Sequence, residues 1–262
     1  MATSIATLLA SSSPNKYEIT SITPPDLSAL TVDLKYNIPM TATSGGVIVS
    51  PDDAAYNLDP DGASFTAGPP AYYSSFAGMQ IDGTNPAFFD KLHDGSTDFW
   101  IAILMRTPTA FSNMTIMGTG INSGNDGMRL YHTASGVSVQ VRQDTGIALN
   151  ENAGRNYGTS KTVLCVFTAD HGTRLRLMQS IDGAPTKDDL SATGYSSTNS
   201  DPAGQPFHLG TDLSLGSTDI GSTARVYWIG GGQEYMDVTN YNALKDALAS
   251  YYPGLTLGTD LS

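Results

Sequence analysis

The sequence has little sulfur, little positive charge and little glutamate. Its single cysteine, Cys165, has no second cysteine for a disulfide within the chain, and it cannot build a cysteine-rich zinc site. Lysine and arginine number 13 against 25 aspartates and glutamates, which gives a net charge of −12. Binding to nucleic acid requires clustered cations that displace counterions from phosphates, so this balance argues against a nucleic-acid partner.

Long apolar runs are also missing. No stretch approaches the roughly 20 apolar residues that a membrane-spanning helix needs, so we expect no membrane insertion. Only three acidic residues are glutamate, whereas aspartate, serine, threonine and glycine are abundant. These residues favour turns, caps and strand surfaces over exposed helix faces, so the composition predicts a β-rich protein.

Proline is concentrated near the N-terminus. Eight of the 14 prolines lie in residues 1–75, where apolar residues come only in short groups. We therefore predict an N-terminal arm or small lobe over residues 1–75 and one β-sandwich domain over residues 76–262. In the arm, Asp59 and Asp61 share a turn and form a weak Ca²⁺ candidate. The turn lacks the other ligands and the closing glutamate of a calcium loop, so a solvated turn without a cofactor is the favoured interpretation.

From residue 76 onward, short apolar runs alternate with glycine, asparagine, aspartate and serine clusters at a spacing typical of a sandwich. Runs 98–106 and 162–169 are apolar on both alternating faces, which predicts central strands covered on each side. In 136–142 strict alternation directs Val137 and Val139 inward and Ser138 and Gln140 outward. Further strands are predicted at 114–120, 127–132, 173–183, 206–212 and 224–232.

A helical pattern follows the last predicted strand. Thr239 or Asn240 can cap its start, and Pro253-Gly254 can stop it. Between them an apolar stripe recurs at steps of three and four residues, formed by Tyr241, Leu244, Leu248 and Tyr251. An amphipathic helix after many strands must pack on the sandwich or on a neighbouring molecule.

The order of these segments resembles the concanavalin A-like lectin/glucanase sandwich, and more narrowly its laminin-G-like branch. Over about residues 78–252 the resemblance is carried by MQIDGTNPAFF, DFWIAILMRT, IMGTG, TVLCVFTADHGTRLRLMQSIDG, FHLGTD and ARVYWIGG followed by the helix. It implies an all-β, concanavalin A-like jelly-roll sandwich with one short C-terminal helix and an extended N-terminal arm. Modules with Ser/Thr-rich arms of this kind are similar to ones found in bacteriophage virion proteins, which implies location in the virion.

Catalytic groups are scarce. Retaining glycosidases need two carboxylates about 5–5.5 Å apart, and the E-x-D-x-E triplet of the glucanase branch is absent. Arg129, Tyr131 and His132 together would suit a polysaccharide lyase, but alternation puts His132 on the opposite face from the other two. A solvated strand surface therefore explains them better. Cys165 lies in an apolar run, where it behaves as a small buried hydrophobe. We expect no enzymatic activity.

Sugar binding remains as a possible chemistry. Lectins of the resembled architecture hold sugars with an aromatic platform and with asparagine or aspartate from loops at one edge. Two loops of this chain supply such residues, namely Asn122, Asn125, Asp126, Tyr195, Asn199 and Asp201. Trp100 and Trp228 lie within apolar strands, so we interpret them as core residues and not as a platform.

Three functions are open at this point. The favoured one is a non-enzymatic structural protein of a bacteriophage virion, a capsid decoration or surface appendage. Its arm would attach to neighbouring subunits such as the major capsid protein, and its lectin-like sandwich would face outward. The alternative is a carbohydrate-binding receptor-recognition module of a tail fibre or cell-surface adhesin, with surface glycans as partners. A glycan-cleaving enzyme is the weakest. Because an arm without a core needs a partner surface, we also expect a homo-oligomer.

Overall fold

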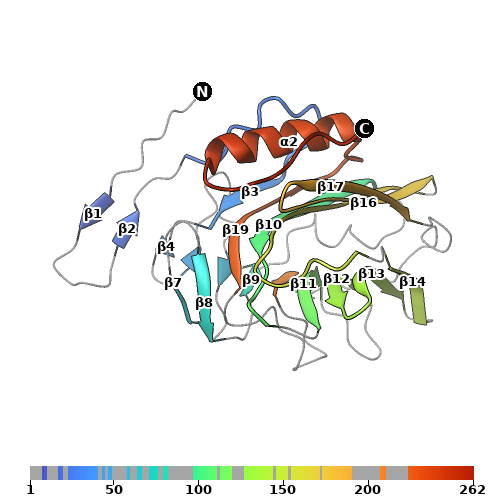
Figure 1. Cartoon of the computed structure of the whole chain (residues 1–262), viewed down its shortest axis with the longest axis horizontal. Coiled ribbons are helices and arrows are strands. Elements are labelled where there is room, and N and C mark those ends of the chain that lie inside the picture. Colours follow the sequence, from blue (N-terminus) through green and yellow to red (C-terminus); the bar gives the residue numbers. More distant parts are fainter. Residues whose placement is uncertain are drawn as a thin grey trace.

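The computed structural model describes residues 8–10, 17–19, 23–40, 43–44, 47–48, 58–59, 64–66, 71–75, 79–81, 97–110, 113–119, 127–143, 146–152, 155–171, 173–190, 207–210 and 224–262. These residues form three layers: helix α2 (Val238–Tyr251), a β-sheet beneath it, and a second sheet against the other face of the first (Figure 1). The predicted all-β sandwich is confirmed.

Both sheets are antiparallel. The sheet under the helix, called the inner sheet, runs in the order β17 (Ala184–Leu190), β16 (Arg174–Ile181), β15 (Thr162–Asp170), β10 (Phe99–Arg106), β19 (Arg225–Gly232), β8 (Ala71–Ser75) and β7 (Ser64–Thr66), and β3 (Tyr36–Pro39) also pairs with β19. The second sheet, called the outer sheet, runs in the order β14 (Gly146–Asn152), β13 (Gly136–Gln143), β12 (Gly127–Thr133), β11 (Met114–Thr119), β18 (Phe207–Leu209), β9 (Met79–Ile81), β6 (Leu58–Asp59), β5 (Val47–Ile48) and β4 (Thr43–Ser44).

Strand β10 shows why the inner sheet is covered on both faces. Phe99, Ile101 and Ile103 belong to the apolar cluster between the two sheets, which also contains outer-sheet residues. Trp100, Ala102 and Leu104 belong to a second cluster that lies beneath α2. Because successive side chains point to opposite faces, a strand between two cores must be apolar at every position. The prediction of a central strand at this point is confirmed.

Helix α2 packs its apolar stripe on the inner sheet, with Tyr241, Leu244 and Leu248 fully buried. Its cap differs from the prediction of Thr239 or Asn240: the Oδ1 atom of Asp237 accepts the N–H of Asn240 at 2.8 Å. Asp237 has the extended backbone that an N-cap requires, whereas Thr239 and Asn240 already lie within the helix. The stop before Pro253 is as predicted.

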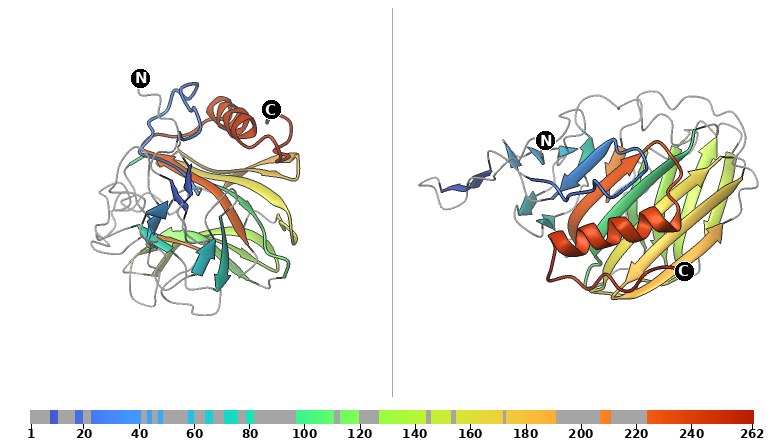
Figure 2. Two further views of the ribbon diagram at one scale, coloured as in Figure 1. Left: turned by 90° about the vertical axis from the view of Figure 1, so that its left-hand side faces the viewer. Right: turned by 90° about the horizontal axis from the view of Figure 1, so that it is seen from above.

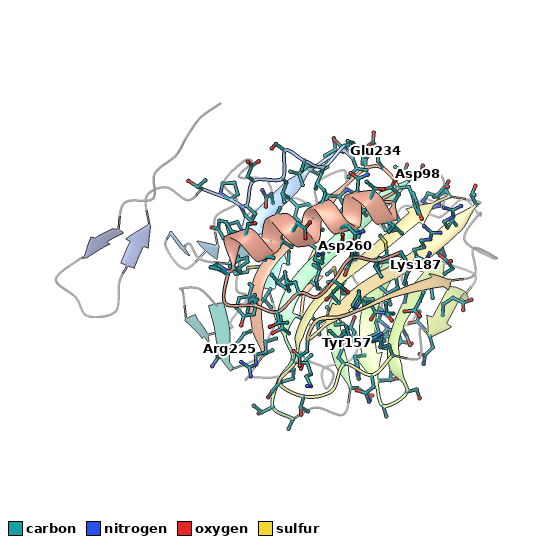
Figure 3. All side chains as sticks on the ribbon, turned by 45° about the horizontal axis from the view of Figure 1, so that its top comes forward. Asp98, Tyr157, Lys187, Arg225, Glu234 and Asp260 are labelled. Atoms are coloured by element: carbon teal, nitrogen blue, oxygen red, sulfur yellow. The ribbon has the colours of Figure 1, made fainter. Side chains whose placement is uncertain are left out.

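After α2 the chain turns back and runs alongside the helix toward the helix start (Figure 2). The Asn242 side chain holds this C-terminal segment, because its Nδ2 donates to the Leu261 carbonyl at 3.1 Å and its Oδ1 accepts the Leu261 N–H at 2.9 Å. Lys245, whose side chain is only 6% exposed, pairs with Asp260 at 2.8 Å. Figure 3 shows Asp260 alongside the helix and Glu234 near its start.

Strands from residues 36–75 enter both sheets. β3 and β8 pair with β19 in the inner sheet, while β4, β5 and β6 extend the outer sheet. The boundary at residue 75 stays a prediction, but the strands in front of it hydrogen bond into the sandwich. The hairpin of β1 (Leu8–Ala10) and β2 (Tyr17–Ile19) projects from the body of the molecule (Figure 1).

The glycines that end β19 allow other groups to lie close to its backbone. A Cβ at Gly230 would lie 2.2 Å from the Trp228 ring, and a Cβ at Gly232 would lie 1.8 Å from the carbonyl oxygen of Asp33. The N–H of Lys35 donates to the Gly231 carbonyl at 2.8 Å. Residues 33–35 therefore lie directly on this strand, which only glycine permits.

Candidate functional site

A row of polar residues crosses the outer sheet. In the strand register, Arg129 on β12 stands opposite Gln140 on β13 and opposite Gly118 on β11. The row continues to Asn150 on one side and through His208, Gln80 and Asp59 on the other. Seven strands thus contribute one row in which every residue except Gly118 carries a polar side chain.

The next row is apolar, and this fixes which way the polar row points. Leu209, Met117, Leu130 and Val139 are opposite one another on adjacent strands, and all four belong to the cluster between the sheets. Neighbouring residues on a strand point to opposite faces. Arg129 and Gln140 therefore face away from the inner sheet, on the side of the sandwich opposite α2.

A second polar row follows, in which Tyr131 stands opposite Thr115 and Ser138. On its other side Ser138 stands opposite Asn152, an exposed residue at the end of β14. We call five residues of these two rows the polar face: Thr115, Arg129, Tyr131, Ser138 and Gln140. Thr115, Ser138 and Gln140 are almost fully buried, at 1%, 3% and 7% exposed. Arg129 and Tyr131 are partly exposed.

Arg129 and Tyr131 form a cation–π pair, with the guanidinium carbon 4.3 Å from the centre of the tyrosine ring. Such a pair is attractive because the positive charge lies against the negative face of the aromatic ring. The amide of Gln140 and the hydroxyls of Ser138 and Thr115 can both donate and accept hydrogen bonds. The polar face therefore places an aromatic ring and a cation, both partly exposed, beside neutral polar groups that are almost fully buried.

The six residues predicted to touch glycans, Asn122, Asn125, Asp126, Tyr195, Asn199 and Asp201, lie outside the described residues. The described residues that flank their two loops are register neighbours. Thr119, which precedes the first loop, pairs with Met128 behind that loop and with Phe207, which follows the second. Both loops therefore join the same end of the outer sheet, one residue beyond the row that contains Arg129.

The calcium candidate lies apart from the polar face. Asp59 stands in the row of Arg129 but four strands away, which at about 4.8 Å per strand is about 19 Å. Asp61 lies outside the described residues, so this site stays a prediction. Within the described ranges, no three His, Cys, Asp or Glu side chains group as ligands for a metal ion.

The structure separates His132 from Arg129 and Tyr131, as alternation predicts. His132 is buried between the sheets, where its Nε2 accepts the backbone N–H of Tyr157 at 3.0 Å. Burial lowers the pKa of this imidazole. His132 therefore serves the core, and the three residues do not form a lyase-like set.

Cys165 is inert by position. It is fully buried between the sheets, and this burial raises the pKa of its thiol to about 12. A nucleophilic cysteine needs the opposite shift, toward thiolate at neutral pH. Trp100 and Trp228 are likewise core residues, as predicted: both are fully buried, and the Trp228 Nε1–H donates to Asn37 Oδ1 at 2.6 Å.

Asp188 on β17 is a partly buried carboxyl group outside the polar face. Burial raises its pKa, and the Nε2–H of Gln179 donates to its Oδ2 at 2.7 Å. A raised pKa suits a general acid, but glycoside cleavage needs a second carboxylate across the scissile bond. The neighbouring Asp189 instead pairs with Arg176. The hydrogen bond that Asp188 accepts from Gln179, at the edge of the inner sheet, is enough to explain the position of its carboxyl group.

None of the helices in the described part of the chain is long and apolar enough to cross a membrane.

The sequence search found no relatives: no family model matches the chain, and no curated protein matches it. Solved structures do match. The Trypanosoma rangeli sialidase, also solved in complex with sialic acid, has a TM-score of 0.56 at 13% identity. The match covers 87% of this chain and 34% of the sialidase. Two botulinum neurotoxin structures match similarly.

One is the serotype D ligand binding domain in complex with N-acetylneuraminic acid, with a TM-score of 0.54, 9% identity, and coverage of 87% of this chain and 52% of that one. The other is titled "Cell entry of botulinum neurotoxin type C is dependent upon interaction with two ganglioside molecules", with a TM-score of 0.58, 12% identity, and coverage of 82% and 51%. The chain spans a third to a half of these proteins. At such low identity the likeness establishes one thing, the β-sandwich fold, and no enzyme activity follows from it.

Proposed function

We propose that this chain is a carbohydrate-binding module that acts without catalysis, and that its ligand binds on the polar face of the outer sheet. The observation that carries the proposal is the cation–π pair of Arg129 and Tyr131, with 4.3 Å between the guanidinium carbon and the ring centre, which is partly exposed on the face of the sandwich opposite α2. Glycan sites combine an aromatic group with a few placed polar groups in this way. The other broad face of the sandwich is covered by α2.

The similar structures support a sugar ligand to a limited degree. A sialidase and a neurotoxin binding domain of the same fold were solved with sialic acid, and a third is described in terms of gangliosides. Because this chain matches only part of each, their ligands are a guide to the kind of molecule to test. The predicted glycan loops flank the same end of the sheet as Arg129, which also favours this face.

A role without catalysis fits the residues of the polar face, because none of the five is a carboxylate that could act as an acid, base or nucleophile. Incubation with algal, bacterial and sialylated polysaccharides should release no reducing ends or free sialic acid. Release that is abolished by changing a single carboxylate of this chain would contradict the proposal.

The binding test compares variants of the polar face with a control on the other sheet. A glycan array identifies ligands, and calorimetry then measures their affinity for wild type, Arg129→Ala, Tyr131→Ala and Arg225→Ala. We expect each polar-face variant to weaken binding by about tenfold or more, since each removes a charge-assisted or stacking contact. Arg225→Ala should leave the affinity unchanged, because Arg225 is an exposed residue at the start of β19 (Figure 3).

Absence of saturable binding to any glycan would refute the proposed function. Equal affinities across all four proteins would move the site away from the polar face. Circular dichroism and thermal unfolding of each variant separate loss of binding from loss of fold.

The setting on a bacteriophage particle is also a proposal, and it rests on the sequence resemblance alone. In it the residues before position 75 attach the chain to other virion proteins such as the major capsid protein, and copies of the chain associate. Limited proteolysis tests this attachment: residues 1–75 should be cleaved in the isolated chain and protected in purified particles. Light scattering of the isolated chain measures its oligomeric state, and absence of the chain from particles would refute the setting.

A further inference from the structure

We infer that copies of this chain join head to tail, and that strand β1 of one copy pairs with the edge strand β14 of the next. The contact is independent of the sugar site, because it is made by the backbones of two sheet edges. It is carried by an isolated hairpin at one end of the molecule, an open sheet edge at the other end, and a blocked edge beside that open one.

The hairpin of β1 and β2 has no sheet to complete it. Its strands are three residues long and, within the described residues, pair only with each other. A two-stranded hairpin that stands alone is at best marginally stable in water. β2 lies beside β4, the last strand of the outer sheet, and β1 lies outermost (Figure 1). The free edge of β1 is therefore in a position to pair with a strand of another molecule.

The chain around β1 lacks the residues that usually keep a sheet edge from pairing. Natural edge strands are protected by lysine and other charged residues or by proline. Residues 1–13 contain no charged residue and no proline. In a chain with a net charge of −12, such an uncharged segment can approach a second copy with little local repulsion.

Strand β14 ends the outer sheet at the opposite end of the molecule (Figure 1). It contains no proline, lysine or arginine, and its one charged residue is Glu151. Residues 149–151 pair with residues 139–141 in unbroken register, and the register shifts only beyond them. Among the described residues no strand pairs with the other edge of β14. The regular part of this edge is thus long enough for β1.

Strand β17, the edge of the inner sheet at the same end, is blocked. Four of its seven residues are proline or charged, namely Pro185, Lys187, Asp188 and Asp189. The Arg155 guanidinium also donates to the Ala184 carbonyl at 2.9 Å, so this backbone acceptor is already used. Of the two edges at this end of the sandwich, β14 is therefore the one that suits a further strand.

The two contacting elements differ and lie at opposite ends, so the contact is heterologous and repeats until a ring closes or a filament grows. It is made by backbone hydrogen bonds and not by opposite charges. Salt screens the repulsion between two copies that each carry a charge of −12, so association should strengthen as salt rises.

The test uses full-length variants that each block one of the two edges. Leu9→Pro breaks β1, because proline cannot donate to a strand ladder, and it leaves the sandwich intact. Asn150→Lys adds to β14 the kind of charge that protects natural edges. Ala184→Lys is the matched control, because it adds the same charge to β17. Sedimentation velocity measures the association of each protein over a range of concentrations at low and high salt.

Wild type and Ala184→Lys should form dimers and larger species as the concentration rises, and more of them at high salt. Leu9→Pro and Asn150→Lys should each stay monomeric where wild type associates. When the two are mixed, a dimer and nothing larger should form, because the intact β1 of the Asn150→Lys protein can pair with the intact β14 of the Leu9→Pro protein. Variants that merely failed to fold would not restore association in this way.

A cross-link checks the same contact without blocking it. Leu9→Cys and Asn150→Cys proteins, mixed and treated with a short bismaleimide, should give a cross-linked dimer that neither protein gives alone. The native Cys165 is fully buried and should not react.

Wild type that stays monomeric at every concentration would overturn the inference. So would unchanged association of Leu9→Pro or of Asn150→Lys, or a mixture of the two that forms no dimer. None of these results bears on the proposed function, because calorimetry with a glycan tests the sugar site separately.

Discussion

Replacing Gly232 by alanine tests how the chain before β3 packs on the sandwich. A Cβ at this position would lie 1.8 Å from the Asp33 carbonyl oxygen and 2.8 Å from Trp100 Nε1. The contacting atom is backbone, so it cannot rotate away, and Asp33 must shift. That shift breaks the hydrogen bond that the Nε1–H of Trp100 donates to the Asp33 carbonyl at 2.9 Å.

The size of the effect follows from two separate costs. Forcing a methyl group into a packed site costs about 1–3 kcal/mol. Leaving the indole N–H of Trp100, a fully buried residue, without an acceptor costs about 1–3 kcal/mol more. Gly232→Ala should therefore lower the free energy of unfolding by about 2–6 kcal/mol, a large part of the about 5–15 kcal/mol typical of a domain.

Urea unfolding followed by tryptophan fluorescence measures this loss, because both tryptophans, Trp100 and Trp228, are fully buried and become exposed on unfolding. Gly254→Ala is the matched control, since a Cβ there has no neighbour within 4 Å. It should leave stability unchanged or raise it by up to about 1 kcal/mol, because alanine restricts the unfolded chain. Substitutions on the surface usually change the free energy of unfolding by less than about 0.5 kcal/mol. If Gly232→Ala changes it by no more than this, residue 33 does not pack on β19 as described here.

Two further predictions concern the core between the sheets. Because the Cys165 thiol is fully buried with its pKa raised to about 12, a thiol reagent at pH 7.5 should label the native protein far more slowly than the chain unfolded in guanidinium; equal labelling rates would show that the thiol is accessible. Burial lowers the pKa of His132 below its ordinary value of 6.5, so the unfolded chain takes up a proton first as the pH falls. The stability from the neutral imidazole is thus fully present above pH 6.5 and is lost as the pH falls below it. His132→Gln, which can still accept the Tyr157 N–H but does not titrate, should flatten unfolding free energies measured between pH 7.5 and 5; an identical pH slope in both proteins would contradict this.

Much of the sandwich was predictable from the sequence, and buried strands were predicted more accurately than strands at the exposed edges. Strands β10 and β15 are apolar throughout residues 99–105 and 163–167 because each is covered on both faces, and the sequence shows this directly. The edge strands β14 and β17 were missed. β17 contains Pro185, Lys187, Asp188 and Asp189, which protect an exposed edge from pairing with other chains but resemble a loop in the sequence.

The candidate site was only half visible from the sequence. Alternation alone placed Arg129 and Tyr131 on one face of their strand, and Ser138 and Gln140 outward on theirs. Nothing in the sequence links the two pairs, so from sequence alone Arg129 and Tyr131 are best explained as a solvated strand surface. The register of β12 against β13 brings the two pairs together.

The amino-acid pattern by itself determined the buried strands, their inward and outward faces and the helix, because each depends on residues near one another in the chain, and the composition determined the excess of negative charge. The tertiary structure alone decided which strands are neighbours, that residues 36–75 pair into both sheets, and that an arginine, a tyrosine and a glutamine meet on the side opposite α2. Hydrogen bonds between strands join residues far apart in sequence, and the local pattern of a strand is compatible with many partners.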